Sequence, residues 1–318
     1  MLTLPRMKVF DGIENFYGVK NPILTIGTFD GVHIGHQHII RQMNEAAIKV
    51  GGETTLLTFH PHPRSVVNTQ GNSMKLIQTL EEKLDKLSKV GLSNVIIQPF
   101  DKAFSCLSAT TFIEDVLINK IKAHHLFIGY DHRFGNSREG DVELLKKFSS
   151  QGHFQLTEIS AVEINEINVS STKIRNSLIS GDITHANELL NGRYCISGVV
   201  EDGMKIGRTI DFPTANIGQI DPHKLLPKNG VYAGKVSFDN QTYNSVFNLG
   251  LRPTVNSDVN EPKLEVHLLN FSGDLYGKSI SVSFEHRLRD EKKFGSIVAL
   301  KHQIQLDESL ARTLLRIH

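Results

Sequence analysis

The first half of the chain alternates between short apolar runs and longer stretches in which apolar residues recur every three or four positions. Short apolar runs predict buried strands, and the longer repeat predicts helices with one apolar face. The predicted strands are residues 23–29, 54–59, 94–97 and 125–128. The predicted helices are residues 35–50, 79–90, 109–121 and 141–148. Alternation of this kind predicts an α/β domain with a mostly parallel sheet covered by helices.

Two of these helices carry further signals. Helix 35–50 is expected to bury a face formed by Ile39, Met43, Ala46, Ala47 and Val50, and Gly51 follows as its stop. Thr79 and Glu82 have the spacing of a capping box at the start of the next helix.

The pattern changes near residue 190. Short alternating segments follow, punctuated by Gly, Pro and Asn, at residues 195–200, 231–238, 245–249, 264–270 and 279–284. These predict an antiparallel β-barrel or sandwich. One long helix closes the chain, with Ile297, Leu300, Ile304, Leu310 and Leu314 as its apolar positions. We therefore predict two domains, 1–185 and 186–318.

Composition narrows the class of protein. Hydrophobic residues make up 39% and charged residues 22% of the 318 residues, as in soluble globular proteins. The net charge of +1 argues against a nucleic-acid partner. No signal peptide and no apolar run of roughly 18 residues is visible, so no membrane partner is expected. Two distant cysteines, Cys106 and Cys195, suit reduced thiols in a cytoplasmic protein.

The segment Gly27-Thr-Phe-Asp-Gly-Val-His-Ile-Gly-His36 carries the strongest chemical signal. It places His33 and His36 between a predicted strand and a predicted helix. Free backbone N–H groups and the positive end of the dipole at a helix N-terminus favour an anion. Glycines let a nucleotide approach the backbone, and two imidazoles can donate to a polyphosphate. This segment predicts chemistry at the α-phosphate of ATP.

Three further pieces follow in order along the first half. Phe59-His-Pro-His-Pro63 comes after the second predicted strand, and Gly129-Tyr-Asp-His-Arg-Phe-Gly135 after the fourth. Val169-Ser-Ser-Thr-Lys-Ile-Arg175 opens another helix, where hydroxyl and cationic groups suit β- and γ-phosphates. Each piece alone has an ordinary structural interpretation, such as a turn or a helix cap. Their occurrence in order, each at a strand end, favours a common nucleotide site.

These segments resemble the adenylyltransferase half of bacterial bifunctional riboflavin kinase/FAD synthetases, a Rossmann-like nucleotidyltransferase domain. The resemblance implies that FMN attacks the α-phosphorus of ATP, giving FAD and pyrophosphate, with His33 and His36 as catalytic residues. It implies ATP-binding roles in this half for Gly27, Phe29, Gly35, Asp131, Ser170, Ser171, Thr172 and Arg175. It implies flavin-binding roles here for Phe59, Pro61, His62 and Phe134.

The second half carries another ordered set of motifs. They are Gly207-Arg-Thr-Ile-Asp-Phe-Pro-Thr-Ala-Asn216, Asn229-Gly-Val-Tyr-Ala233, Asn248-Leu-Gly-Leu-Arg-Pro-Thr254, Leu264-Glu-Val-His-Leu268, Asp274-Leu-Tyr-Gly277 and Arg287-Leu-Arg-Asp-Glu-Lys-Lys-Phe294. The hydroxyl of Thr214 and the carboxamide of Asn216 can face one side of an extended segment, and hard oxygen ligands suit Mg²⁺. Glu265 and His267 alternate with apolar neighbours and are expected to line one face of a strand.

This set resembles the riboflavin kinase half of the same family, a β-barrel domain with a long C-terminal helix. The resemblance implies phosphorylation of riboflavin to FMN by ATP and Mg²⁺, with Glu265 as the base for the riboflavin hydroxyl. It implies Mg²⁺ ligands at Thr214 and Asn216. It implies ATP-binding roles for Gly207 and Arg208, and flavin-binding roles for Arg287 and Phe294.

Three residues depart from the family pattern. His60 replaces a common acidic residue and His132 a frequent phenylalanine, which we expect to alter affinity and pH response rather than reaction type. Asp211 replaces a glycine in the kinase phosphate loop. A negative charge about 4 Å from a phosphate costs on the order of 4 kcal/mol at an effective dielectric near 20, so the kinase is weakened if Asp211 faces the phosphates.

The favoured interpretation is a bifunctional enzyme that makes FMN and then FAD, acting on small-molecule substrates as a monomer or weak homo-oligomer. The nearer alternative is an FMN adenylyltransferase with a weak or inactive kinase domain because of Asp211. A flavin- or nucleotide-responsive binding protein requires His33, His36 and Glu265 to be idle. A tRNA-charging enzyme shares a related histidine motif, but no basic stripe is visible here.

Overall fold

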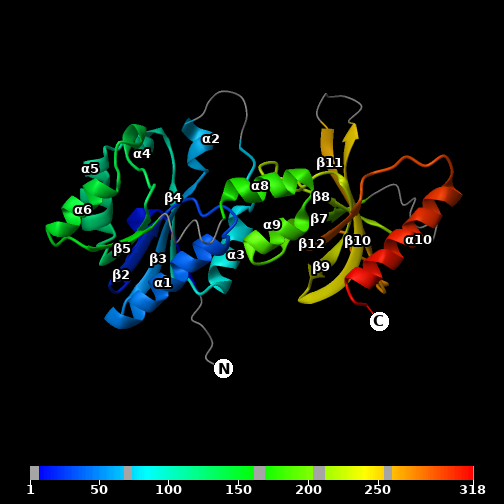
Figure 1. The fold of residues 1–318 in the computed structure, drawn as a ribbon, viewed down its shortest axis with the longest axis horizontal. Coiled ribbons are helices and arrows are strands. Elements are labelled where there is room, and N and C mark those ends of the chain that lie inside the picture. Colours follow the sequence, from blue (N-terminus) through cyan, green and yellow to red (C-terminus); the bar gives the residue numbers. More distant parts are fainter. Residues whose placement is uncertain (1–6, 68–73, 161–168, 203–211, 254–259, 318) are drawn as a thin grey trace. The chain divides into compact units, whose positions relative to one another are not determined.

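The computed structural model describes residues 7–67, 74–160, 169–202, 212–253 and 260–317, and does not describe the side chains of 251–253 and 260–262. Contacts divide the chain into two compact units, Met1–Ser171 and Thr172–His318. Figure 1 shows an α/β unit at the N-terminal end and a barrel in the C-terminal half. Both predicted fold classes are therefore confirmed.

The first unit contains a six-stranded sheet in which every pair is parallel. Its order is β1–β4–β3–β2–β5–β6. The strands are β1 (Lys8–Asp11), β2 (Pro22–Ile26), β3 (Glu53–His60), β4 (Asn94–Pro99), β5 (His125–Gly129) and β6 (Gln155–Ile159). The edge strands β1 and β6 were not predicted, because β1 is short and mostly exposed and β6 buries only Ile159 fully.

Helices cover both faces of this sheet. They are η1 (Ile13–Asn15), α1 (Ile34–Val50), α2 (Pro63–Val67), α3 (Leu80–Lys89), α4 (Lys102–Ser105), α5 (Ala109–Thr111), η2 (Phe112–Lys120), η3 (Asn136–Arg138) and α6 (Val142–Ser150). The predicted helix 109–121 is a short α-helix that continues as the π-helix η2. The capping box of Thr79 and Glu82 is confirmed at the start of α3.

Successive residues of each central strand point to opposite faces, as strand geometry requires. On one face, Leu56 and Val95 pack with Ile40 of α1 and Leu87 of α3. On the other, the core is formed by strand residues packed against η2 and α6: Leu24, Ile26, Leu57, Ile96, Phe112, Ile113, Leu126, Ile128, Leu145 and Phe148. The sheet is thus the middle of three layers.

The buried face of α1 differs slightly from the prediction. Its fully buried residues are Ile40, Met43 and Ala47, while Ile39, Ala46 and Val50 lie half-buried at the flank. The N-terminus of α1 therefore stays at the carboxyl edge of the sheet, with Met43 and Ala47 packed against Ile23 of β2.

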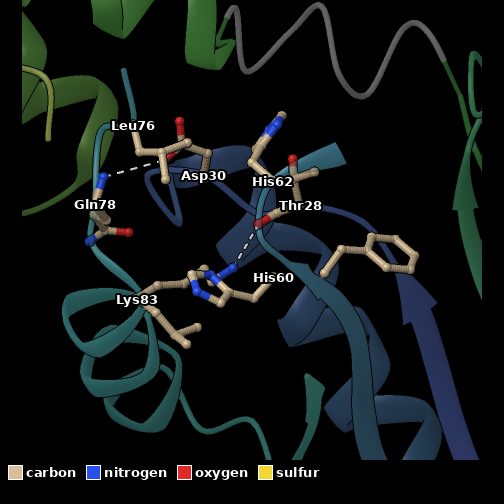
Figure 2. A pocket seen from close by; sticks show the side chains of 9 residues that line it. Thr28, Asp30, His60, His62, Leu76, Gln78 and Lys83 are labelled. Atoms are coloured by element: carbon tan, nitrogen blue, oxygen red, sulfur yellow. Dashed lines mark hydrogen bonds between the residues drawn. The ribbon is translucent and has the colours of Figure 1, made fainter. Parts of the chain in front are cut away.

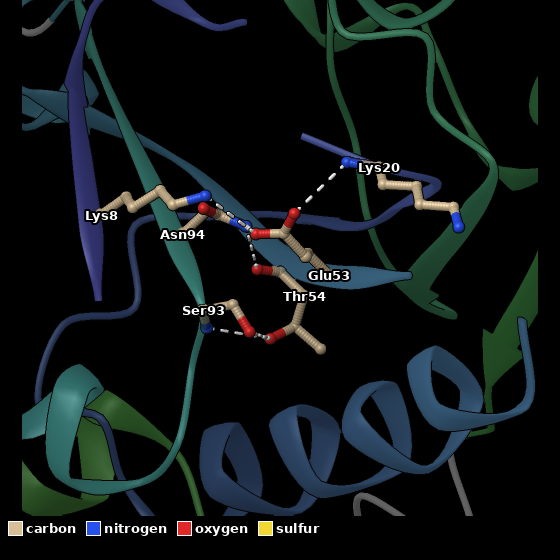
Figure 3. A network of polar contacts seen from close by, with 6 residues as sticks. All are labelled: Lys8, Lys20, Glu53, Thr54, Ser93 and Asn94. Carbon is tan, nitrogen blue, oxygen red and sulfur yellow. Dashed lines mark hydrogen bonds and ion pairs between the residues drawn. The ribbon is translucent and has the colours of Figure 1, made fainter. Parts of the chain in front are cut away.

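A polar network fixes the opposite, amino-terminal edge of the sheet (Figure 3). The Glu53 carboxylate accepts hydrogen bonds from Lys8 Nζ at 3.3 Å, from the Lys20 backbone N–H at 3.3 Å and from Asn94 Nδ2 at 3.4 Å. Burial raises the pKa of Glu53, but these hydrogen bonds outweigh it and the pKa is lowered. The network links β1, β3 and β4 at their amino-terminal ends, opposite the carboxyl edge of the sheet.

The second unit is a closed barrel with the strand order β10–β11–β8–β7–β12–β9 and antiparallel pairing throughout. Its strands are β7 (Tyr194–Glu201), β8 (Ala215–Gly218), β9 (Gly230–Phe238), β10 (Gln241–Pro253), β11 (Asn260–Leu268) and β12 (Ser279–Arg289). Its helices are α8 (Ser171–Ser180), α9 (Ile183–Leu190) and α10 (Ile297–Leu314). The interior contains stacked and edge-on aromatic rings of Tyr194, Tyr232, Phe247 and Phe284.

The C-terminal helix exists as predicted (Figure 1). Its side-chain packing differs from the prediction. Only Asp307 and Ala311 of α10 are buried. Ile297, Leu310 and Leu314, three of the five predicted apolar positions, are exposed. The helix is held by a bidentate pair from Arg289 of β12 to Asp307, with Nε–Oδ1 at 2.9 Å and Nη2–Oδ2 at 2.7 Å. A charged pair thus replaces part of the expected apolar seam.

Candidate active sites

The adenylyltransferase motifs predicted from the sequence meet at one edge of the parallel sheet. Strands β3, β2 and β5 are neighbours and run in the same direction. The segments that follow them, from Gly27, His60 and Tyr130 onward, therefore leave at the same carboxyl edge. This position is where open α/β sheets bind ligands.

The turn between β2 and α1 has an unusual backbone. Phe29, Gly31 and Val32 have φ values of 48°, 93° and 38°. A positive φ is costly for a β-branched residue such as valine, on the order of 1–3 kcal/mol, and such conformations concentrate at functional sites. The buried side chains of Phe29, Asp30 and Val32 hold this turn in place.

Three aromatic rings are stacked at the N-terminus of α1. The rings of His33 and His36 lie 3.6 Å apart at 14°, and the Phe29 ring lies 4.3 Å from His36 at 19°. His33 is 7% exposed, and His36 Nδ1 is buried without a hydrogen-bond partner in the described part of the chain. The two predicted catalytic histidines therefore form one rigid unit with Phe29.

His33 is also the N-cap of α1. Its Nδ1 accepts a hydrogen bond from the His36 backbone N–H at 3.4 Å. A neutral imidazole that accepts at Nδ1 carries its proton on Nε2. The cap therefore sets the tautomer, and leaves Nε2–H as the donor for an anion at the helix N-terminus.

Both imidazoles are neutral near pH 7. Burial, helped by the positive charge of Lys86, lowers the pKa of His33 to about 4. Burial also lowers the pKa of His36 well below its usual range, with further contributions from His33, Lys83 and Lys86. The pair can thus act as neutral hydrogen-bond donors to a polyphosphate.

Gly35 allows the neighbouring groups to approach the start of α1. A Cβ atom at this position would lie 3.1 Å from Val169 Cγ1 and 3.3 Å from the His33 ring. Ser171 at the start of α8 donates its hydroxyl to the Asp30 carbonyl oxygen at 3.0 Å. The structure therefore brings Val169 and Ser171 to the histidine turn, as the sequence motif predicted.

A small open recess lies beside the histidine turn (Figure 2). Its lining is Thr28, Asp30, Phe59, His60, His62, Leu76, Gln78, Leu80 and Lys83. The Asp30 carboxylate accepts backbone hydrogen bonds from Ile77 at 3.0 Å and Gln78 at 3.3 Å, which fix the start of α3 against the turn. Two predicted flavin residues, Phe59 and His62, thus border the same space as the turn.

Aromatic side chains support the Phe59 side of the recess. The Phe59 ring lies 5.4 Å from Phe100 and 5.8 Å from Phe104. Phe104 lies 6.2 Å from Phe112, which lies 5.6 Å from Phe134. The predicted flavin residues Phe59 and Phe134 are therefore the two ends of one aromatic cluster.

The remaining predicted residues of this half are less enclosed. Pro61 is exposed after a cis His60–Pro61 bond, and Asp131 is exposed after β5. Ser170 is half-buried before α8, and within α8 Thr172 is exposed and Arg175 half-buried. The segment Ser170–Arg175 spans the division between the two compact units.

His132, one of the departures from the family pattern, lies beside Phe134. Their ring centroids are 6.0 Å apart at 24°, and His132 Nε2 is buried without a partner among the described residues. Burial lowers the pKa of His132 to about 4, against the opposing charge of Asp131. His132 is therefore a neutral aromatic ring at this position.

In the barrel, the predicted base and one predicted metal ligand lie opposite each other. Glu265 of β11 pairs in register with Asn216 of β8 on one side and with Asn248 of β10 on the other. Directly opposed residues of adjacent strands share a face. Since Leu264 and Val266 point into the barrel, this row of Asn216, Glu265 and Asn248 lies on its outer face.

The outer row is half-exposed and polar. Lys263 Nζ lies 2.6 Å from Glu265 Oε1, and both side chains are about one-third accessible to solvent. Asn248 Nδ2 donates to Glu291 Oε1 at 2.9 Å. Thr214 is exposed just before β8. The hydroxyl of Thr214 just before β8, the carboxamide of Asn216 in β8 and the carboxylate of Glu265 in β11 form a hard-oxygen set of the kind that fits Mg²⁺.

His267 shares the face of Glu265, as predicted. Its Nδ1 lies 2.8 Å from the Pro213 carbonyl oxygen, and its ring meets Phe212 edge-on at 5.5 Å. These contacts tie the segment before β8 to β11 and so position Thr214 near the row.

The two predicted flavin residues of the barrel, Arg287 and Phe294, each contact other charged groups. Arg287 Nη2 donates to the Asn229 carbonyl at 2.8 Å and to Asp290 at 2.6 Å, and its guanidinium lies 5.9 Å from the Tyr232 ring. Phe294 lies beneath the guanidinium of Arg289 at 5.9 Å. Arg287 lies near the end of β12, and Phe294 follows that strand.

Gly207, Arg208 and Asp211 lie outside the described residues, so their predicted roles stay predictions. Within the described ranges, no group of three or more His, Cys, Asp or Glu side chains has the arrangement of a metal site.

Sequence analysis missed Asp30, Lys83 and Asn248. Lys83 offered a signal, because it interrupts the apolar stripe of Leu80, Leu84 and Leu87 on its helix. A charge within an apolar face predicts either a buried partner or a ligand. Asp30 and Asn248 lie within motifs that were recognised, but their neighbours are brought in by distant parts of the chain.

Comparisons with known proteins match the two halves of the chain to two enzyme families. A family model described as FAD synthetase matches residues 19–173, and one described as riboflavin kinase matches residues 190–315.

Curated relatives match almost the whole chain. Proteins named bifunctional riboflavin kinase/FMN adenylyltransferase are 37% identical in Buchnera aphidicola subsp. Schizaphis graminum, covering 96% of this chain and 98% of the relative. The relative from Pseudomonas fluorescens is 36% identical and covers 97% of this chain and 98% of its own length. The relative from Escherichia coli K12 is 37% identical and covers 96% of this chain and 97% of its own length.

A solved structure has the same fold. It is titled as a macrolide-efflux protein from Streptococcus pneumoniae, is 28% identical, and superposes with a TM-score of 0.87 over 96% of this chain and 98% of the other. Among the described residues of the present chain, no helix combines the length and apolarity needed to span a membrane.

Proposed function

This chain belongs to the family of bifunctional riboflavin kinases/FMN adenylyltransferases, and we propose that it converts riboflavin to FMN and FMN to FAD. We assign adenylyl transfer to residues 1–185 and phosphoryl transfer to residues 186–318. The observation that carries the first assignment is the stack of Phe29, His36 and His33 at the N-terminus of α1.

Adenylyl transfer requires no nucleophile from the protein. An oxygen of the FMN phosphate forms a bond to the α-phosphorus of ATP, while the bond from that phosphorus to the bridging oxygen breaks and pyrophosphate leaves. Neutral His33 and His36 donate hydrogen bonds to the triphosphate as charge moves onto the leaving group. Gly27, Gly35 and Ser171 shape the same turn, with Ser170, Thr172, Arg175 and Asp131 as further ATP-binding residues.

The flavin is proposed to enter the recess beside this turn. Phe59 and His62 line it, and Phe134 supports the aromatic cluster behind Phe59. Pro61 holds the same segment. Aromatic side chains can stack on the isoalloxazine ring, which places the phosphate end of FMN toward the histidine turn.

Phosphoryl transfer is proposed at the outer row of the barrel. The riboflavin 5′-hydroxyl oxygen forms a bond to the γ-phosphorus, the bond to the β-phosphate breaks, and Glu265 takes the hydroxyl proton. The ion pair of Glu265 with Lys263 is half-exposed, so it is weak and can yield to substrate. Thr214 and Asn216 would hold Mg²⁺, which offsets phosphate charge when bound.

The other members of the kinase site are assigned from the family motif. Gly207 and Arg208 are proposed to contact ATP, and Arg287 and Phe294 to contact the flavin. The alternative of a weak kinase depends on Asp211, and no observation favours it. The riboflavin kinase match over residues 190–315 supports an active second domain.

We further propose a cytoplasmic enzyme with Mg²⁺ as its cofactor, acting as a monomer or weak homo-oligomer without a nucleic-acid or membrane partner. The test is chromatography of flavins after separate incubations of riboflavin and FMN with ATP and Mg²⁺. We expect FMN and FAD from riboflavin, and FAD with pyrophosphate from FMN. Absence of FAD in the FMN incubation would contradict the adenylyltransferase, and absence of ADP in the riboflavin incubation would contradict the kinase.

A further inference from the structure

Lys83 is a buried cation at the floor of the recess (Figure 2). It lies on α3 with 8% of its surface exposed, and its Nζ donates to the Thr28 carbonyl at 3.2 Å and to Thr58 Oγ1 at 3.1 Å. Both acceptors are uncharged oxygens. An ammonium group has three N–H donors, and among the described residues only these two acceptors are bonded, so one donor direction is open to a ligand in the recess.

The groups around Lys83 are polar, and most of them can donate hydrogen bonds to an anion. The buried carboxylate nearby, Asp30, accepts backbone hydrogen bonds from Ile77 and Gln78. His60 and His62 line the same recess and can donate hydrogen bonds. In the part of the chain that the structure describes, Lys83 makes no direct ion pair, and only the charge of Asp30 offsets part of its burial. Burying a lysine in this way is costly, and a bound anion would reduce that cost.

Lys83 contacts both segments that meet in the recess. Its Nζ bonds the Thr28 carbonyl, in the turn that leads to His33, and the hydroxyl of Thr58, which precedes Phe59 in β3. Phe59 and His62 line the recess and belong to the wall assigned to the flavin. Adenylyl transfer needs the phosphate of FMN at the junction between the flavin wall and the nucleotide turn, and Lys83 lies at this junction.

We propose that Lys83 binds the 5′-phosphate of FMN and holds it for attack on ATP. The proposal rests on the adenylyltransferase function of the first domain. Two polyanions must meet in this reaction, and a fixed ammonium between them reduces their repulsion and orients the attacking oxygen. Nothing is consumed at Lys83, which touches the reacting phosphate without exchanging a bond.

The charge state of Lys83 gives a second readout. Burial lowers the pKa of Lys83 to about 8, against the opposing charge of Asp30. The other titratable groups that face it include His36, His60 and His62. Lys83 is therefore cationic at pH 7 and loses its proton in the free enzyme as the pH rises above about 8.

The test compares Lys83→Met with wild type in FAD formation from FMN and ATP by the full chain. Methionine keeps an unbranched stem and removes the charge. We expect KM for FMN to rise at least tenfold, while KM for ATP stays within twofold. The inhibition constant of lumiflavin, which has the ring but no phosphate, should also stay within twofold. Lys89→Met on the exposed side of the same helix is the matched control and should match wild type.

A role in shaping the pocket predicts a different result. If KM for FMN and the lumiflavin constant rise together, or if KM for ATP rises instead, Lys83 does not bind the FMN phosphate. Wild-type kcat/KM for FMN should also fall above about pH 8, and Lys83→Met should lack this fall. An identical alkaline limb in both proteins overturns the assignment. A wild-type enzyme that makes no FAD from FMN refutes the proposed function itself, which is a distinguishable outcome.

Discussion

His33 combines a structural and a chemical role in one imidazole. Its Nδ1 caps α1 through the His36 backbone N–H, and its ring stacks on His36. The cap leaves Nε2–H as the donor toward the anion site. Removing the ring therefore disturbs both helix capping and phosphate binding, and substitutions must be chosen to separate the two.

Substitution of His33 by Asn and by Ala makes this separation. Asparagine is a good N-cap, so His33→Asn should unfold at a temperature close to that of wild type, while His33→Ala should lose about 1 kcal/mol of stability. Both should lower FAD formation from FMN by roughly a hundredfold, because one oxyanion donor is lost. The measurements are thermal unfolding and steady-state FAD formation. Wild-type activity in a folded His33→Asn protein would contradict the role of the ring.

The depressed pKa of His33 also predicts how stability depends on pH. The unfolded residue titrates near 6.5 and the folded one near 4, so the unfolded state binds more protons between these values. The contribution of neutral, buried His33 to the free energy of unfolding is fully present above pH 6.5 and is lost as the pH falls toward 4. It amounts to about 3 kcal/mol at most, from roughly 1.4 kcal/mol per pK unit.

Thermal unfolding at pH 7.0 and pH 5.0 measures this effect. We expect a lower unfolding temperature at pH 5.0 in wild type and a smaller difference in His33→Asn. His132 has the same sign, so part of the difference should remain in the variant. An equal pH dependence in the two proteins would show that His33 titrates normally in the folded state.

Single residues were predictable where their chemistry is local. His33, His36 and Gly35 follow from one short motif because strand, turn and helix start are contiguous in sequence. Lys83 and Asp30 were not predicted, since their meeting depends on β2, β3 and α3 packing together. The depressed pKa values of the histidines likewise depend on burial, which the motif alone does not give.

At the scale of elements, strong periodicity predicted the central parts of both domains. Strands β2 to β5 and helices α1, α3 and α6 were located because each buries a continuous run or stripe. Edge strand β1 is short and mostly exposed, so it has no such run. In α10 the prediction of apolar packing was wrong for Ile297, Leu310 and Leu314, because Asp307 and Ala311 face the barrel instead.

The Arg289–Asp307 pair is expected to decide whether α10 stays attached to the barrel. Asp307→Ala should destabilise the protein by about 3 kcal/mol, because Arg289 is left partly buried without its carboxylate. Glu308→Ala is the control. It removes the more exposed pair with Arg312 and should cost less than about 1 kcal/mol. Chemical denaturation of the two variants measures the difference, and equal losses would contradict the structural role of Asp307.

At the scale of the whole molecule, the chain combines two folds with two phosphate chemistries. A parallel sheet gathers the ends of several strands at one edge, where the histidine turn lies. A closed barrel presents Asn216, Glu265 and Asn248 in a row on its outer face. The product of the proposed barrel reaction, FMN, is the substrate of the proposed reaction at the sheet edge.

The two-part architecture was predictable because the residue pattern changes near residue 190. The site of the barrel was predictable only in part. Alternation placed Glu265 and His267 on one face, but the pairing of Glu265 with Asn216 depends on strand register between segments about 50 residues apart. The sequence gives no direct signal for that register, since both strands alternate in the same way.

The most direct measurement supplies riboflavin, ATP and Mg²⁺ to a folded variant that combines His33→Asn and His36→Ala, with flavins followed by chromatography. The account predicts that FMN accumulates and FAD formation is lost, because only the sheet-edge site is damaged. Glu265→Gln is the reciprocal control, and should still convert added FMN to FAD while failing to use riboflavin. FAD formation at the wild-type rate in the double variant would contradict the assignment of adenylyl transfer to the stacked histidines.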